Sequence, residues 1–233
     1  MTAFRAFLFD FDGVLGDTAA LNHETYDLAL RTHGYSLSIE DFVTQYIHLK
    51  DDDVFRTASQ DRDLGFSEKD IADLTALKRG LFLERLGSRN LLFAGAAEFV
   101  RRVHQRGPCA IVSMSYWPNV EKILERGGIY DCFSVFVTEA DVTRPKPDPQ
   151  PYLIGLERLN AEQRERKAAP LAASECLIIE DTRAGLRSGK AAGMHSAALT
   201  HTTPAELLSE AEPDTLAKSF AQLAQLFAQQ GRI

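Results

Sequence analysis

The feature that most constrains the fold is a series of short apolar runs separated by helical segments. Five runs have the length of a strand: residues 4–9, 109–113, 133–137, 176–180 and 195–199. Helical patterns lie between most of them, at residues 96–106, 118–126, 150–160 and 184–192. Continuously apolar strands that alternate with helices are typical of a parallel sheet covered on both faces. The pattern therefore predicts an α/β core with a parallel sheet.

Residues 18–88 have a different pattern, with no strand-like run. Their apolar residues recur at helical spacing, most clearly in "IADLTALKRGLFLERL" at 71–86. We interpret this segment as a helical domain inserted after the first strand. The predicted domains are a core of residues 1–17 and 89–233 and a helical cap of residues 18–88. The charged segment at 160–170 is expected to be a solvated helix extension and loop.

Composition excludes several classes of partner. With 45% hydrophobic and 25% charged residues, the chain has ample material for a globular core. The net charge of −7 argues against nucleic acid or an anionic membrane as the main partner. No apolar run approaches the ~18 residues that a membrane span needs. The three cysteines show no CxxC pair, which favours reduced thiols in the cytoplasm. We expect a cytoplasmic monomer or weak homodimer.

The stretch "FLFDFDGVLGDT" at 7–18 ends an apolar run in carboxylates. In an open parallel sheet, ligands bind beyond the carboxyl ends of the strands. Asp10 and Asp12 are two residues apart, so they point to the same side, where they repel each other unless a cation or a proton lies between them. Mg²⁺ accepts one or two carboxylates and often bridges to a substrate phosphate. The alternative is a solvated strand end without chemistry.

Three more segments place polar groups at the same predicted edge of the sheet. Ser113 ends the second run and Lys146 lies between prolines in "TRPKPDPQPYL". Glu180 ends the run "CLIIE", and Asp181 follows it directly. Each has an ordinary alternative, because serine caps helices, lysine is common in loops, and carboxylates favour helix N-termini. Their conjunction at neighbouring strand ends nevertheless predicts a site for phosphate and magnesium.

Four of these segments together carry a resemblance. "DFDGVLGDT", a serine after a strand, "PKPDP" and "IIEDTRAGLRSGKAAGM", in this order, resemble the four motifs of the haloacid dehalogenase superfamily. The helical insertion resembles the C1-type cap of that superfamily. By motif, the chain is most similar to the group of phosphoglycolate phosphatases, β-phosphoglucomutases and CbbY-like proteins. The resemblance covers residues 1–17 and about 89–200, and it implies a Rossmann-like core.

The resemblance also implies catalytic roles. Asp10 would be the nucleophile that accepts the phosphoryl group as an aspartyl phosphate. Asp12 would be the general acid–base that protonates the leaving oxygen and then activates water. The cofactor Mg²⁺ would be held by Asp10, by the backbone carbonyl of Asp12 and by Asp181. Glu180 would act through water or as an alternative metal ligand.

Two more implied roles concern the phosphate and the substrate. Ser113 and Lys146 would hold the transferring phosphoryl group. A metal and a lysine suit this chemistry, because attack by a carboxylate on phosphate brings anions together. In the cap, "HLKDDD" at 48–53 is expected to face the site, with Lys50 contacting an anionic part of the substrate. The alternative for Lys50 is a solvated charge cluster with the neighbouring aspartates.

The implied function is magnesium-dependent hydrolysis of a small phosphomonoester, with a phosphorylated metabolite as the partner. A sugar-phosphate mutase is the alternative within the same site chemistry. Mutases of the β-phosphoglucomutase type carry a histidine where this chain has Asn22, with His23 one residue later. The segment at 46–55 also departs from the mutase pattern. Both departures favour the phosphatase.

Two further alternatives lie outside phosphate-ester chemistry. Phosphonoacetaldehyde hydrolases use a cap lysine, which would fit Lys50, but they carry alanine in place of Asp12. Haloacid dehalogenases proper also lack this second aspartate, so Asp12 favours phosphate esters over C–Cl or C–P cleavage. A binding protein that kept only the fold would be indicated by loss of Asp10, Asp12, Lys146 or Asp181, and all four are present.

Overall fold

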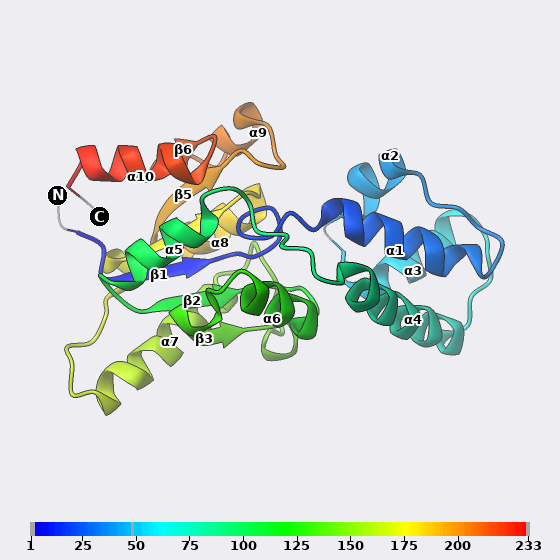
Figure 1. The fold of residues 1–233 in the computed structure, drawn as a ribbon, viewed down its shortest axis with the longest axis horizontal. Coiled ribbons are helices and arrows are strands. Elements are labelled where there is room, and N and C mark those ends of the chain that lie inside the picture. The colour runs from blue at the N-terminus through cyan, green and yellow to red at the C-terminus, as the bar shows by residue number, and fades with distance from the viewer. Residues whose placement is uncertain (1–2, 48, 232–233) are drawn as a thin grey trace. The chain divides into compact units, whose positions relative to one another are not determined.

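The computed structural model describes residues 3–47 and 49–231, and its internal contacts divide the chain into two units (Figure 1). The core unit comprises the residues through Asp17, Asn90–Met114 and the residues from Val120 onward. The helical unit comprises Thr18–Arg89 together with the short segment Ser115–Asn119. Each unit has its own buried apolar cluster and is described by itself.

The core unit contains a six-stranded parallel sheet, so the predicted α/β, Rossmann-like fold class is confirmed. The strands lie in the order β3-β2-β1-β4-β5-β6. Their bounds are β1 (Ala6–Phe9), β2 (Cys109–Val112), β3 (Phe133–Val137), β4 (Cys176–Glu180), β5 (His195–Leu199) and β6 (Thr215–Ala217). The first five correspond to the predicted runs. The sixth was not predicted, because three residues at the sheet edge are too short to show a strand pattern.

Helices cover both faces of this sheet. They are α5 (Ala96–His104), α6 (Trp117–Arg126), α7 (Gln150–Glu165), α8 (Arg183–Ala191), α9 (Ala205–Ser209) and α10 (Phe220–Gln229), with short 3₁₀ turns η2 (Tyr130–Cys132), η3 (Glu139–Asp141) and η4 (Ala173–Glu175). On one face, Leu8 and Ile178 share a buried cluster with Tyr152 of α7. On the other, the ring of Phe9 meets that of Phe99 of α5 at 6.3 Å. Alternate strand residues thus serve opposite layers, as expected for a buried parallel sheet.

The helical unit is built from α1 (Ala19–Arg31), α2 (Ile39–Asp41), the π-helical turn η1 (Phe42–Tyr46), α3 (Asp51–Asp61) and α4 (Glu68–Leu86). Helix α4 packs against both α1 and α3. It begins at a reciprocal cap, because the Asp70 amide donates to the Ser67 hydroxyl and the Ser67 amide donates to the Asp70 carboxylate. Buried Leu30, Phe55 and Leu74 belong to the apolar cluster between the helices. Within residues 18–47 and 49–88 the structure contains no strand, as predicted.

Two surface features complete the fold. The charged segment at 160–170 is the last part of α7 followed by a loop, and residues 164–170 are exposed, as predicted. None of the helices in residues 3–47 and 49–231 combines the length and apolar character needed to cross a lipid bilayer.

Candidate active site

Strand register places the predicted acidic residues side by side. Phe9 of β1 pairs with Ile111 of β2 and with Ile179 of β4. The next residue, Asp10, therefore lies level with the ends of both neighbouring strands, and its amide donates to the Ile179 carbonyl at 3.0 Å. Glu180 follows Ile179 directly. The strand-end argument from the sequence thus brings Asp10 and Glu180 together at the carboxyl edge of the sheet.

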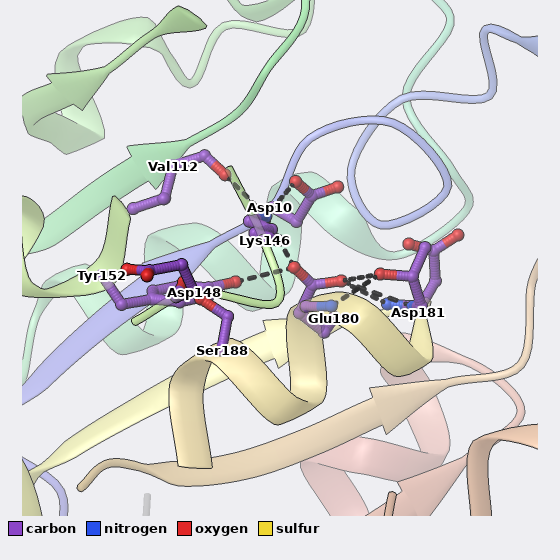
Figure 2. Close-up of polar contacts among 10 residues, drawn as sticks. Asp10, Val112, Lys146, Asp148, Tyr152, Glu180, Asp181 and Ser188 are labelled. Carbon is purple, nitrogen blue, oxygen red and sulfur yellow. Dashed lines mark hydrogen bonds and ion pairs between the residues drawn. The ribbon is translucent and has the colours of Figure 1, made fainter. Parts of the chain in front are cut away.

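Lys146 reaches this edge from the loop between β3 and α7 (Figure 2). Its ammonium donates to Asp10 Oδ1 at 2.6 Å, to Glu180 Oε1 at 2.6 Å and to the Val112 carbonyl at 3.0 Å. The Lys146 side chain is only 10% exposed. Because an ammonium group has three N–H donors, all three are engaged by these acceptors.

The loop that carries Lys146 is fixed at both ends. The Ser188 hydroxyl of α8 donates to the Asp148 carbonyl at 2.6 Å (Figure 2). The Gln150 side-chain oxygen accepts from the backbone amides of Thr143 and Arg144, at 2.9 and 2.7 Å. These contacts hold the lysine-bearing turn against α8, so the position of the ammonium does not depend on its own bonds alone.

Glu180 is fully buried and has both carboxylate oxygens engaged (Figure 2). Besides Lys146, Oε1 accepts from the Tyr152 hydroxyl at 2.8 Å. Oε2 accepts from the amides of Asp181 and Thr182 and from the Thr182 hydroxyl, at 3.2, 3.3 and 3.0 Å. Glu180 therefore stabilises the start of α8, as the helix-cap alternative expected, and also orients Lys146.

Asp181 supplies the most direct sign of a cation site. One carboxylate oxygen from each of Asp10, Glu180 and Asp181 lies within 4.8 Å of the others. Asp181 Oδ1 is buried and has no hydrogen-bond partner among the described residues. A buried carboxylate oxygen without a donor is costly unless a cation satisfies it. We call Asp10, Lys146, Glu180 and Asp181 the acidic cluster; fully ionised, its charges sum to −2, which suits a divalent hard cation.

The pKa values of the cluster reflect this imbalance. Burial has the largest effect on Asp10 and raises its pKa to about 7; Lys146 opposes the shift, and the charges of Glu180 and Asp12 add to it. Burial, followed by the charges of Asp10 and Glu180, raises the pKa of Asp181 well above its usual value. Burial alone would lower the pKa of Lys146, but the charges of Asp10 and Glu180 raise it. One lysine is too little to offset three carboxylates.

The remaining predicted site residues are placed as follows. Asp12 forms an isolated bridge with Gly16, and its carboxylate is not part of the three-carboxylate group. Ser113 is buried directly after β2, with its amide donating to the Val137 carbonyl at 3.0 Å. Lys50 is the N-cap residue of α3 in the helical unit, partly buried, and His48 of the same predicted segment lies outside the described residues. The roles of Asp12, Ser113 and Lys50 stay predictions.

The helical unit contains a buried ionic group that sequence reasoning missed. Asp51 Oδ1 accepts from Lys78 at 2.7 Å and from the Tyr26 hydroxyl at 2.6 Å, and Oδ2 accepts from Arg79 Nε at 2.7 Å. Lys78, only 2% exposed, also donates to the Asn22 side chain at 2.9 Å. We call Tyr26, Asp51, Lys78 and Arg79 the basic cluster, in which two cations share one carboxylate.

Two residues of the core site were also missed. Tyr152 lies within the quoted "TRPKPDPQPYL" segment, where its hydroxyl gave no signal of its own. Thr202 donates its hydroxyl to Asp181 Oδ2 from the loop that follows β5. A signal for Thr202 was present, because applying the strand-end argument to the run at 195–199 would have selected the polar residues that follow it.

Comparison with known proteins agrees with this geometry. The family described as haloacid dehalogenase-like hydrolase matches residues 4–193. Hexitol phosphatase A of Escherichia coli (strain K12) is 33% identical over 221 residues, covering 94% of this chain and 93% of the relative. The chain therefore belongs to the haloacid dehalogenase-like hydrolases. The predicted superfamily is confirmed, and so is the prediction of an enzyme of the phosphatase type.

Solved structures show the same fold. A predicted phosphoglycolate phosphatase from Haemophilus somnus superimposes with a TM-score of 0.82 at 19% identity, covering 97% of this chain and 99% of that one. The β-phosphoglucomutase from Clostridium difficile superimposes with a TM-score of 0.80 at 20% identity, covering 97% of this chain and 96% of that one. Phosphatases and mutases thus share this architecture.

Proposed function

We propose that the chain is a magnesium-dependent phosphatase of small phosphomonoesters, of the sugar-phosphate or phosphoglycolate type, that works through an aspartyl phosphate on Asp10. The observation that carries the proposal is that Asp10, which accepts from Lys146, lies at the same sheet edge as a buried oxygen of Asp181 that has no hydrogen-bond partner among the described residues. The phosphatase names of a full-length relative and a structural neighbour support the substrate class. A cytoplasmic location belongs to the same proposal.

The acidic cluster fits Mg²⁺ by its donor set. Asp10 and Asp181 would hold the ion together with the backbone carbonyl of Asp12, while Glu180, whose oxygens are engaged by protein donors, would act through water. Bound there, the ion would offset the negative charge of phosphate among the carboxylates. Gly13 is part of this fit: its φ is +75°, and a Cβ there would lie 1.9 Å from Asp181 Oδ2, so only glycine leaves the carboxylate its place.

The residues divide the chemistry into two steps. A carboxylate oxygen of Asp10 attacks phosphorus, the ester P–O bond breaks, and Asp12 gives its proton to the leaving oxygen. Asp12 then takes a proton from water as that water attacks phosphorus, which breaks the bond to Asp10 and releases inorganic phosphate. Lys146 would exchange one of its acceptors for a phosphoryl oxygen, and Ser113 would donate to another.

A mutase is the second candidate, because β-phosphoglucomutases share the fold. The helical unit contains little that favours it. His23, the histidine displaced by one residue, has its Nε2 2.8 Å from the Leu37 carbonyl and its ring beside Phe42, so it serves the unit's own packing. Asn22, at the mutase histidine position, accepts from Lys78. Asn22 has no imidazole, and the imidazole of His23 already contacts Leu37 and Phe42 within the helical unit.

The proposal is tested with a panel of hexitol phosphates, sugar phosphates and phosphoglycolate, with Mg²⁺ and with excess chelator. We expect phosphate release that requires Mg²⁺ and is absent in Asp10→Asn. In parallel, ³¹P NMR with β-glucose 1-phosphate should show inorganic phosphate or no reaction. Glucose 6-phosphate as the main product would establish the mutase, and full turnover in chelator would refute the metal dependence.

A further inference from the structure

The loop after β5 contributes to the site, although no residue of this loop is among the four motifs. Residues 200–203 follow the strand directly, at the same edge of the sheet as the acidic cluster. The Thr202 hydroxyl donates to Asp181 Oδ2, while Asp181 Oδ1 has no partner among the described residues. The two oxygens of one carboxylate thus have different surroundings: one is held by the protein, and one is left for a ligand.

The loop is held in place independently of this bond. The ring of His201 stacks on Phe93, with centroids 4.1 Å apart, and its Nδ1 lies 3.1 Å from the Gly13 carbonyl. The bond to Gly13 ties the loop after β5 to the loop after β1, which carries Asp12. Thr202 also packs against the same glycine, since a Cβ at Gly13 would lie 3.0 Å from Thr202 Cγ2. The hydroxyl is therefore presented to Asp181 by a fixed backbone.

We propose that Thr202 is a positioning residue for the metal ligand Asp181. Its hydroxyl occupies Oδ2 and fixes the rotation of the carboxylate, so that Oδ1 faces the cation position. A carboxylate without this donor would lose its preferred orientation before the cation binds. Partners that orient metal ligands in this way typically account for about 10–100-fold in metal affinity. The inference rests on the proposed function, because it assumes that the acidic cluster binds Mg²⁺.

The test compares Thr202→Val, which removes the hydroxyl at nearly constant shape, with Thr202→Ser, which keeps it. Thr203→Val is the matched control in the same loop. Mg²⁺ binding to the metal-free proteins is measured by isothermal titration calorimetry, with thermal melting as a check of folding. We expect the valine variant to bind Mg²⁺ about 10–100-fold more weakly, and the serine variant and the control to resemble the wild type. At saturating Mg²⁺, kcat of the valine variant should recover most of its wild-type value.

The outcomes separate the two claims. If the wild type binds Mg²⁺ and folded Thr202→Val binds it within twofold of the wild type, the role of Thr202 is refuted and the metal site stands. If Thr202→Ser loses as much affinity as Thr202→Val, the hydroxyl is not the cause and the role is likewise refuted. If the wild type itself binds no Mg²⁺, the proposed metal site fails and the role of Thr202 fails with it.

Discussion

The two buried charged clusters are built with opposite balance, one in each unit. In the acidic cluster one lysine faces three carboxylates, and in the basic cluster two cations share one carboxylate. Burial is the main cause that raises the pKa of Asp10 to about 7; the single cation Lys146 lowers it too little to cancel this effect, and the charges of Glu180 and Asp12 add to the rise. Burial would raise the pKa of Asp51 as well, but the charge of Lys78 and hydrogen bonds from Arg79, Lys78 and Tyr26 lower it.

The acidic cluster, with its excess negative charge, has the properties of a cation-binding site. The basic cluster, in which Asp51 already has two cationic partners, needs no ligand to satisfy its carboxylate. A buried cluster with excess carboxylates reduces the stability of the protein until a cation binds, whereas a carboxylate already held by two cations becomes a source of instability only when a partner is removed. Replacing one aspartate by asparagine should therefore have opposite effects on stability in the two units.

The largest effect is expected for Asp10→Asn. Loss of the nucleophile should reduce kcat by at least about 10⁴-fold. The same change removes one negative charge from the acidic cluster while an amide oxygen can still accept from Lys146, so the metal-free protein should become more stable. Differential scanning calorimetry should show a higher Tm, by about 2–4 °C per kcal/mol gained. Mg²⁺ should then raise the Tm of the wild type more than that of the variant.

A lower Tm for metal-free Asp10→Asn would contradict the argument from charge balance, whatever its effect on turnover. Retention of turnover would contradict the assignment of the nucleophile. The two readouts therefore test separate statements about the same carboxylate.

The next largest effect is expected for Asp51→Asn, which should destabilise the helical unit. The change leaves Lys78 buried with its main counter-charge removed, and breaking a buried ion pair in this way typically costs about 3–5 kcal/mol. Asp52→Asn is the control, because this neighbouring side chain is 50% exposed and should change stability by no more than about 0.5 kcal/mol. Calorimetry or urea unfolding measures both. Equally small losses of unfolding free energy in Asp51→Asn and Asp52→Asn would show that the basic cluster does not stabilise the helical unit.

The difference in stability between the wild type and Asp51→Asn should depend on pH. Asp51 has a folded-state pKa below its ordinary value of 3.8, so its contribution is fully present above pH 3.8 and is lost as pH falls through the folded-state value. Urea unfolding at pH 7, 5 and 3 should show a constant gap between the two proteins at pH 7 and 5 and a smaller gap at pH 3. A stability difference that stays constant down to pH 3 would show that the neighbouring cations do not stabilise the ionised form of the Asp51 carboxylate.

The same comparison explains what could be predicted from the sequence. Glu180 ends an apolar strand and Asp10 and Asp181 each follow one directly. Parallel register brings strand ends together, so local pattern and a general rule were sufficient. Lys146 was found from its motif. Asp51 is one of three consecutive aspartates, and nothing in the local sequence distinguishes it from Asp52 and Asp53. Only the packing of α3 on α4 buries it and leaves its two neighbours half exposed, at 50% and 48%.

Residues that act through tertiary contact were missed for the same reason. Lys78 and Arg79 read as ordinary polar positions of a helix, and the Tyr152 hydroxyl meets Glu180 only after α7 packs on the sheet. The short edge strand β6 depends on its pairing with β5 and has no pattern of its own. Chemistry at strand ends is thus readable from sequence, whereas pairing between packed elements is not.

The smallest effect is expected for Lys50→Ala. This substitution tests whether Lys50, a cation outside the basic cluster, contacts the substrate. Lys78 is buried and engaged by Asp51, whereas Lys50 is partly buried at the N-cap of α3, where its carbonyl accepts from the Val54 amide at 3.0 Å. If Lys50 contacts the non-reacting end of an anionic substrate, the alanine variant should lose about 1–3 kcal/mol in kcat/KM with that substrate. A neutral aryl phosphate should be turned over almost as before, and Lys69→Ala, which changes an exposed lysine of α4, should affect neither substrate. Steady-state kinetics with both substrates decides the question: equal losses, or none with either, would remove Lys50 from substrate recognition.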